Sequence, residues 1–199
     1  MAPNNTRILG RLGVLPEIAK RCNFMSKNSL RRWKDNAELG NAPLMPEIAK
    51  KYGAPLGVIH RGDLQLTLLQ AAKDNNVDIR VDHKVIKADP NFEARVQLQS
   101  GEWIEGDLVI AADGIKSHLR AQIAEHHNHK DHSTPTGDAA YRILIPKDKM
   151  LHDEYALKLL NEDVGMRWMG PGGHIMAYPL KNNTVYNVSR LNIPMDLTH

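Results

Sequence analysis

Residues 106–120, which read GDLVIAADGIKSHLR, constrain the fold more than any other stretch of the chain. The apolar run from Leu108 to Ala112 is too short for a helix of ordinary length, and it lies between Gly106 and an Asp-Gly pair. This pattern predicts a strand buried on both faces, as in a parallel sheet. We expect a helix to begin directly after the Asp-Gly pair.

The end of this predicted strand is a candidate ligand site, because open α/β sheets bind ligands at the carboxyl ends of their strands. The carboxylate of Asp113, the turn residue Gly114, the first N–H groups of the next helix and Arg120 would meet at this point. Such a set of groups suits a ribose hydroxyl and a nearby phosphate. An ordinary strand–turn–helix corner is the alternative, since Asp-Gly is common in turns.

Composition excludes several classes of protein. The 199 residues are 42% hydrophobic and 25% charged, which is typical of a soluble globular protein. The net charge of +3 and the aromatic content of 5% do not indicate a nucleic-acid partner. Cys22, the single cysteine, cannot form an internal disulfide. No apolar run approaches the ~20 residues of a transmembrane helix, and the N-terminus lacks the apolar core of a secretory signal, so we expect a cytoplasmic protein.

Hydrophobic periodicity predicts alternating helices and strands. We expect helices over residues 3–22 and 147–161 and in the stretch that starts at Arg61, with one or two helical turns over 46–52. The expected strands are a hairpin over 27–45, a short strand at 56–60, an antiparallel meander over 77–106 that includes 78–81, and three antiparallel strands at 165–170, 174–180 and 184–191.

Several segments, taken in order, resemble the FAD-dependent aromatic hydroxylases (group A flavin monooxygenases, salicylate hydroxylase-like). The matching segments are His60-Arg61-x-Asp63-Leu64, ADG-x-x-S-x-x-R at 112–120, AAYRILIP at 139–146, Trp168-x-Gly170-x-Gly172-Gly173-His174 and Ala177-Tyr178-Pro179-Leu180. Together they cover nearly the whole chain, and their shared order is far more specific than any one of them. The segment at 139–146 resembles the first strand of the family's substrate domain, so we expect a strand there.

The resemblance implies an α/β fold that combines an incomplete FAD-binding Rossmann-like domain, of the glutathione reductase type, with an antiparallel β-sheet substrate domain. We expect a partial FAD-binding domain over 1–125 with the meander inserted, a His-rich linker over 126–138, and a partial substrate domain over 139–199. The sequence contains no G-x-G-x-x-G loop. The chain is therefore expected to be the middle of a larger enzyme.

The roles of individual residues follow from the resemblance. The implied cofactor is FAD with NADH or NADPH as reductant, and the implied substrate is an aromatic or polyketide-like small molecule. The residues expected to contact FAD are Arg61, Asp113, Gly114 and Arg120, and those expected to orient the substrate are Arg142 and Tyr178. From the residues alone, Arg61 is equally consistent with a solvent-facing arginine, and Tyr178 with core packing.

Two hypotheses from other classes stay open. A non-catalytic relative of the family would pair with another chain, or with itself, through exposed sheet edges. A metal-binding protein would use the histidines of the polar loop, but no cysteine lies nearby and nothing fixes their geometry, so we expect no metal site. These histidines are His126, His127, His129 and His132. Asp138 receives no flavin role, because Tyr141-Arg142 follows where the family's GDAAH-type motif has His-Pro.

Overall fold

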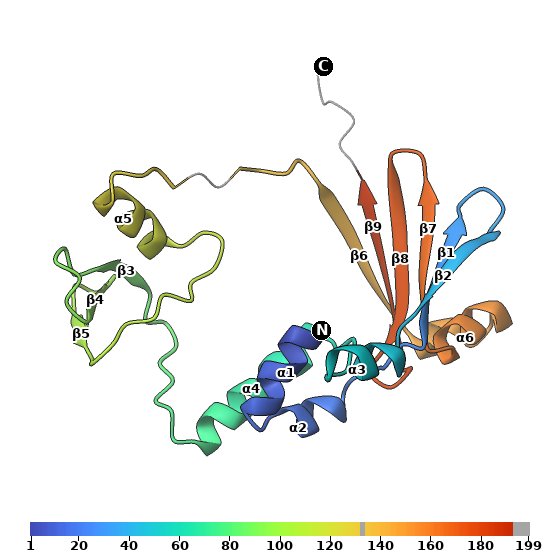
Figure 1. The fold of residues 1–199 in the computed structure, drawn as a ribbon, viewed down its shortest axis with the longest axis horizontal. Helices are drawn as coiled ribbons and strands as arrows, with labels where there is room; N and C mark the ends of the chain where they lie inside the picture. Colours follow the sequence, from blue (N-terminus) through green and yellow to red (C-terminus); the bar gives the residue numbers. More distant parts are fainter. Residues whose placement is uncertain (132–133, 193–199) are drawn as a thin grey trace. The chain divides into compact units, whose positions relative to one another are not determined.

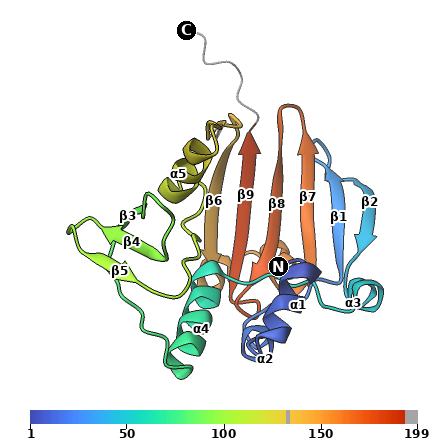
Figure 2. The same ribbon diagram turned by 60° about the vertical axis from the view of Figure 1, so that its left-hand side comes forward.

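The computed structural model describes residues 1–131 and 134–192, in two compact units. The larger unit contains Met1–Val77 and the chain from Gly137 onward, and the smaller unit is Asp78–Thr136. Figures 1 and 2 show the helices and strands of both. None of the described helices is long and apolar enough to span a membrane.

The larger unit is built on a six-stranded mixed sheet. Its strands are β1 Lys27–Arg32, β2 Glu38–Pro43, β6 Ala139–Pro146, β7 Val164–Gly170, β8 Gly173–Leu180 and β9 Val185–Asn192. Its helices are α1 Pro3–Arg11, α2 Leu15–Ala19, α3 Glu47–Tyr52, α4 Arg61–Asp74, the 3-10 helix η1 Lys147–Met150 and α6 Glu154–Asn161.

The strand order is β2-β1-β7-β8-β9-β6, so the N-terminal hairpin joins the same sheet as the C-terminal strands (Figure 1). β1 and β7 are parallel, with Ser29 opposite Met166, and all other neighbours are antiparallel. The predicted hairpin and the three predicted antiparallel strands are confirmed. The compact units do not coincide with the ranges 1–125 and 139–199, which divide the chain by function and stay a prediction.

One face of this sheet packs against α6. Ala177 of β8 and Tyr186 of β9 are buried in a core with Met150 and Leu160, and Leu160 is 0% exposed. Neighbouring residues of a strand point to opposite faces. Tyr178, one position beyond Ala177, therefore lies on the opposite face, which we call the open face of the sheet.

The predicted helix over 147–161 is wrong in one respect, because it is divided into η1 and α6. Asp153 lies at the break and caps α6, since its carboxylate accepts a hydrogen bond from the N–H of Ala156 at 2.9 Å. An aspartate at a helix N-cap satisfies an N–H group that would otherwise lack a partner, and this favours a new helix start here.

The N-terminal helices form a second, smaller core. Leu9 of α1 and Ile18 of α2 are buried with Cys22, and Leu64 of α4 packs against them. The predicted helix over 3–22 is interrupted between α1 and α2, where Gly13 has a φ of 73°. The predicted strand at 56–60 is reduced to a single antiparallel bridge between Asn23 and Val58.

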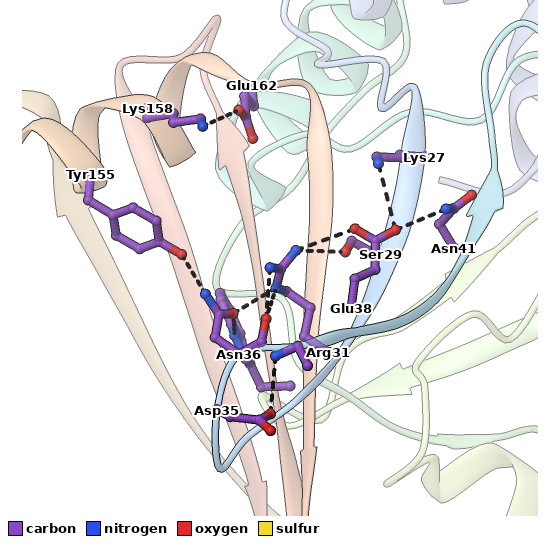
Figure 3. A network of polar contacts seen from close by, with 12 residues as sticks. Lys27, Ser29, Arg31, Asp35, Asn36, Glu38, Asn41, Tyr155, Lys158 and Glu162 are labelled. Carbon is purple, nitrogen blue, oxygen red and sulfur yellow. Dashed lines mark hydrogen bonds and ion pairs between the residues drawn. The ribbon is translucent and has the colours of Figure 1, made fainter.

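A network of hydrogen bonds and ion pairs around the β1–β2 turn connects the hairpin to the rest of the sheet (Figure 3). Asn36 has a φ of 58°, and its side-chain oxygen accepts hydrogen bonds from Trp168 Nε1 at 2.8 Å and from Arg31 Nε at 2.6 Å. Its Nδ2 donates to the hydroxyl of Tyr155 on α6 at 3.1 Å. One turn residue thus links β1, β7 and α6.

The smaller unit contains a three-stranded antiparallel sheet in the order β3-β4-β5, followed by a helix. Its elements are β3 Val85–Ala88, β4 Arg95–Leu98, β5 Trp103–Glu105 and α5 His118–His126. The predicted meander is confirmed, except that residues 78–81 form no strand. Asp89 is buried after β3, and its carboxylate accepts a hydrogen bond from Arg95 Nε at 2.7 Å.

The prediction of a buried strand at Leu108 to Ala112 is wrong. These residues form no regular strand, and Leu108 and Ile110 are 75% and 79% exposed. A strand of a parallel sheet needs hydrogen-bonding neighbours for its backbone groups. In the described part of the chain, no strand pairs with this segment, so its apolar side chains remain at the surface.

Candidate functional site

The Asp-Gly turn leads into α5 through a capped helix start. Gly114 has a φ of 80°, a conformation that glycine adopts at little cost. The helix begins at His118 and not directly after the glycine, with Ser117 as its N-cap. The Ser117 hydroxyl accepts a hydrogen bond from the backbone N–H of Arg120 at 2.9 Å. The turn therefore has a defined conformation, although no paired strand precedes it.

Asp113 is ionised at this corner. A hydrogen bond from the Ser117 hydroxyl lowers the pKa of Asp113, and backbone N–H groups at the start of α5 add to this effect against a cost of desolvation. The carboxylate is on an exposed residue. It offers negatively charged acceptor oxygens to solvent or to a hydroxyl-bearing ligand.

Arg120 holds the corner in place. Its Nη1 donates to the carbonyl of Gly114 at 3.1 Å and its Nη2 to the carbonyl of Ile115 at 2.7 Å. Its Nε and Nη2 also bond the carboxylate of Asp131, at 3.0 and 2.9 Å. The sequence predicted that Asp113, Gly114 and Arg120 lie close together. It did not identify Asp131, which lies in a polar loop without a motif. Because Arg120 makes these bonds, it positions the turn and has few donors left for a phosphate.

Arg61 is the first residue of α4, as expected from the sequence, and it is exposed. In residues 1–131 and 134–192, its guanidinium makes no ion pair with an acidic side chain. Asp63, two positions later, lies 3.4 Å from Lys181 Nζ in the β8–β9 turn and 3.9 Å from His60 Nδ1. The helix start is thus held by its neighbours, while the Arg61 side chain stays free to contact a ligand. Arg61 belongs to the larger unit and Asp113 to the smaller.

Arg142 and Tyr178 lie on the same open face of the sheet. Arg142 of β6 is opposite Ser189 of β9, and Tyr178 of β8 is opposite Asn187 of the same strand. Residues that are opposite each other on neighbouring strands lie on the same face of the sheet. Asn187 and Ser189 are two positions apart on β9, so they and their two partners share one face. One strand separates β6 from β8, so the two strands are ~10 Å apart. Long side chains at these positions can contact one small molecule from two sides.

Two further polar groups on the open face were not identified from the sequence. Arg167 of β7 is opposite Met176, which places it on this face, and its Nη2 lies 3.4 Å from His174 Nε2. Arg167 Nε and Asn187 Nδ2 are buried, and within the described residues neither has a hydrogen-bond partner. Buried donors of this kind normally have a partner, so they suit a polar ligand or bound water. Their only sequence signal is a polar residue at alternate positions of an otherwise apolar strand.

Of the described histidines in the predicted linker, His126 and His127 are ring neighbours, with 5.2 Å between their centroids. The helix α5 extends through His126, whose ring packs edge-on against Phe92 at 4.7 Å between centroids. Among the described residues, no group of three His, Cys, Asp or Glu side chains is placed to hold a metal ion. His132 lies outside the described residues.

Sequence comparison relates nearly all of the chain to flavin-dependent enzymes. No protein-family model matches the chain. It is 42% identical over 181 residues to the FAD-dependent monooxygenase atnJ of Arthrinium sp, and the aligned region covers 88% of this chain and 40% of atnJ. It is 31% identical over 201 residues to the FAD-dependent monooxygenase OpS4 of Beauveria bassiana, and the aligned region covers 99% of this chain and 46% of OpS4. The chain thus spans less than half the length of these two curated relatives.

Solved structures show the same fold at lower identity. A salicylate hydroxylase in a substrate complex superimposes with a TM-score of 0.77 at 21% identity, over 99% of this chain and 48% of that one. Klebsiella pneumoniae HpxO, complexed with FAD and uric acid, gives a TM-score of 0.79 at 18% identity, over 100% and 48%. The fold match agrees with the mixed sheet and the separate antiparallel sheet described above. Over nearly its whole length the chain is thus similar in sequence to FAD-dependent monooxygenases and in fold to a salicylate hydroxylase.

Proposed function

We propose that the chain is part of a FAD-dependent monooxygenase that hydroxylates an aromatic or polyketide-like small molecule. The observation that carries the proposal is the shared open face of Arg142 and Tyr178, in a fold that a salicylate hydroxylase adopts in complex with its substrate. Both relatives described above are named as FAD-dependent monooxygenases, which supports the same reaction class.

Arg142 and Tyr178 are proposed to orient the substrate. An arginine stays charged and can bind a carboxylate or phenolate through two parallel hydrogen bonds. The tyrosine hydroxyl can donate to or accept from a ring substituent. Asn187, between them on the sheet, adds a buried amide donor that has no protein partner among the described residues. Together these groups would fix the ring in one orientation.

FAD is the proposed cofactor, with NADH or NADPH as reductant, and when bound it supplies the oxygen-transfer chemistry. Three residues are suited to direct contact with the dinucleotide. Arg61 has a free guanidinium for a phosphate, and Asp113 has an ionised carboxylate for a ribose hydroxyl. A Cβ added at Gly114 would meet no atom within 4 Å, so the backbone there is open to close approach. Arg120 fits as the residue that holds this turn, through its bonds to Asp131 and two carbonyls.

We also propose the functional division of the chain. Residues 1–125 would form part of a Rossmann-like FAD-binding domain, 126–138 a linker, and 139–199 part of a substrate domain. The match of FAD-complexed HpxO to the whole chain supports this division.

Flavin fluorescence tests the cofactor proposal directly. Titration of the purified chain with FAD should quench the flavin emission, and Arg61→Ala and Asp113→Ala should each weaken binding by at least about tenfold, which corresponds to ~1.4 kcal/mol. Arg11→Ala and Asp148→Ala remove the same charges at other exposed positions and should leave binding unchanged. Equal losses in the control variants, or tight binding in both site variants, would contradict the proposed cofactor site.

A second candidate is a subunit that works only when paired with another chain or with itself. The observation in its favour is the exposed apolar surface of Leu108 and Ile110, together with β6, which is a terminal strand of the larger sheet. Apolar runs and free strand edges favour association. Sedimentation velocity over a range of concentrations should show dimers that Ile110→Lys disrupts. A monomer at all concentrations, in the absence of a partner, would exclude self-association.

A further inference from the structure

The face of the large sheet that packs on α6 contains a cavity that is separate from the open face. It has a volume of about 440 Å³ and is lined mainly by apolar side chains. The strand residues that line it include Trp168, Ile175 and Tyr186, whose positions alternate with those of Arg167, Met176 and Asn187 on the open face. The volume lies in the range of ~300–1,000 Å³ that is usual for small-molecule sites.

Two tryptophans form walls of this cavity. Trp33, directly after β1, is 61% exposed and lies against Gly170, where an added Cβ would come within 3.0 Å of the indole. Trp168 is oriented by the hydrogen bond from its Nε1 to Asn36. An indole held by a hydrogen bond, such as that of Trp168, loses little side-chain entropy when a ligand packs against it, and the exposed ring of Trp33 adds apolar contact area.

Tyr186, one of the residues that line the cavity, has a polar group without a hydrogen-bond partner among the described residues. Tyr186 is 4% exposed, and its hydroxyl is buried without a hydrogen-bond partner among the described residues. Burial raises the pKa of Tyr186, so the hydroxyl keeps its proton and can act as a donor. A buried hydroxyl that lacks a partner is costly, and a ligand acceptor in the cavity would remove this cost.

An adjoining hollow of about 250 Å³ adds a positive charge. It shares Trp33, Trp168 and Ile175 with the cavity and is also lined by Arg190, an exposed residue of β9. Arg190 is opposite Ile175 in the ladder, so it lies on the same face of the sheet as the cavity. A ligand that fills both spaces would have an apolar body beside the indoles and an anionic group near the guanidinium.

We propose that this cavity is a second small-molecule site, which binds a flat aromatic molecule with an anionic group between Trp33, Trp168 and α6. The ring system contacts the indoles, an acceptor atom receives the Tyr186 hydroxyl, and the anionic group lies at Arg190. None of Arg61, Asp113, Arg142 and Tyr178 lines the cavity. The site is therefore independent of the proposed oxygenase site, and either can be absent without the other.

The fluorescent dye 8-anilinonaphthalene-1-sulfonate tests this site, because it is aromatic and anionic. The chain has three tryptophans, and Trp103 belongs to the other compact unit. In a Trp103→Phe background, all tryptophan emission therefore comes from the cavity walls. Binding should quench this emission and increase that of the dye, with saturation at one equivalent. Dye emission that increases without quenching of the tryptophans would overturn the proposal.

Three variants locate the dye. Ala156→Phe places a ring in the cavity from α6 and should abolish binding, while circular dichroism confirms that the variant is folded. Tyr186→Phe should weaken binding about 2–10-fold, which is the contribution of one hydrogen bond. Arg190→Gln should weaken binding of the dye but not of neutral N-phenyl-1-naphthylamine.

The matched control is Leu108→Ser, which removes an exposed apolar side chain of the smaller unit and should leave dye binding unchanged. Loss of binding in this control would place the dye on the exposed segment and overturn the proposal. Unchanged binding in folded Ala156→Phe would do the same. If Ala156→Phe does not fold, unchanged binding in both Tyr186→Phe and Arg190→Gln would overturn it.

Discussion

The α6-facing side of the large sheet and the segment from Leu108 to Ala112 contain similar apolar side chains in very different surroundings. In the sheet, Ala177 and Tyr186 are buried against α6, and Leu160 of that helix is fully buried. In the segment, Leu108 and Ile110 are largely exposed. The difference shows that an apolar run determines a strand only when a neighbouring strand and a covering helix are present.

The physical cause is the way in which each region satisfies its backbone. The strands of the sheet pair along their whole length, from Ala139 opposite Asn192 to Pro146 opposite Val185 in β6 and β9. Each pairing satisfies N–H and C=O groups, and it presents alternate side chains to one covering layer. The Leu108 segment has no pairing strand in the described chain, so its apolar character yields no burial.

The largest expected effect compares the same substitution in the two regions. Leu160→Ala should lower the free energy of unfolding by ~2–5 kcal/mol, because it leaves a cavity between α6 and the sheet. Leu108→Ala should change it by less than about 0.5 kcal/mol, because the side chain is exposed. Urea unfolding followed by circular dichroism measures both. A large cost for Leu108→Ala would show that the segment is buried in solution, and the comparison would then fail.

A smaller effect is expected at the turn that closes the sheet region. Asn36→Gly keeps the positive φ but removes the acceptor of Trp168 Nε1, so it should cost ~1–3 kcal/mol. Asn36→Ala should cost more, because alanine is strained at this φ. Urea unfolding gives both values. Lys34→Ala, in the same turn and exposed, is the control and should be nearly neutral. Equal stability of all three variants would show that the network of Figure 3 does not hold the hairpin.

The smallest effect concerns the helix cap at the Asp-Gly corner. Ser117→Ala should destabilise the start of α5 by ~0.5–2 kcal/mol, because the N–H of Arg120 loses its acceptor. Amide hydrogen exchange in α5 measures this loss. Ser100→Ala, in the meander turn of the same unit, is the matched control and should leave α5 unchanged.

The same substitution should change the titration of Asp113. Its pKa is lowered in the folded chain, mainly by the Ser117 hydroxyl. The ionised carboxylate therefore contributes stability above the pKa of a free aspartate, ~3.9, and this contribution is lost as the pH falls through the folded value. Carboxyl carbon NMR should show a midpoint below ~3.9 in the parent chain and a higher one in Ser117→Ala. An unchanged midpoint would show that the hydroxyl does not bond the carboxylate.

Much of the sheet could be predicted because its local signals agree with its tertiary contacts. The strands β6 to β9, the β1–β2 turn at Lys34-Asp35-Asn36 and the helix start at Arg61 were all correctly placed. The parallel pairing of β1 with β7 was not predicted, since it joins segments more than 130 residues apart and has no local signal. The order of the family motifs supported the relation to FAD-dependent monooxygenases without any knowledge of these contacts.

The candidate site divides in the same way. The sequence by itself determined the Asp-Gly corner and the arginine at the start of α4, because each depends on a few adjacent residues. Only the tertiary structure decided that Arg142 and Tyr178 share one face, that Arg120 is held by Asp131, and that Trp33 and Trp168 line one cavity. Strand register and burial depend on which distant segments pair, and no local pattern specifies that choice.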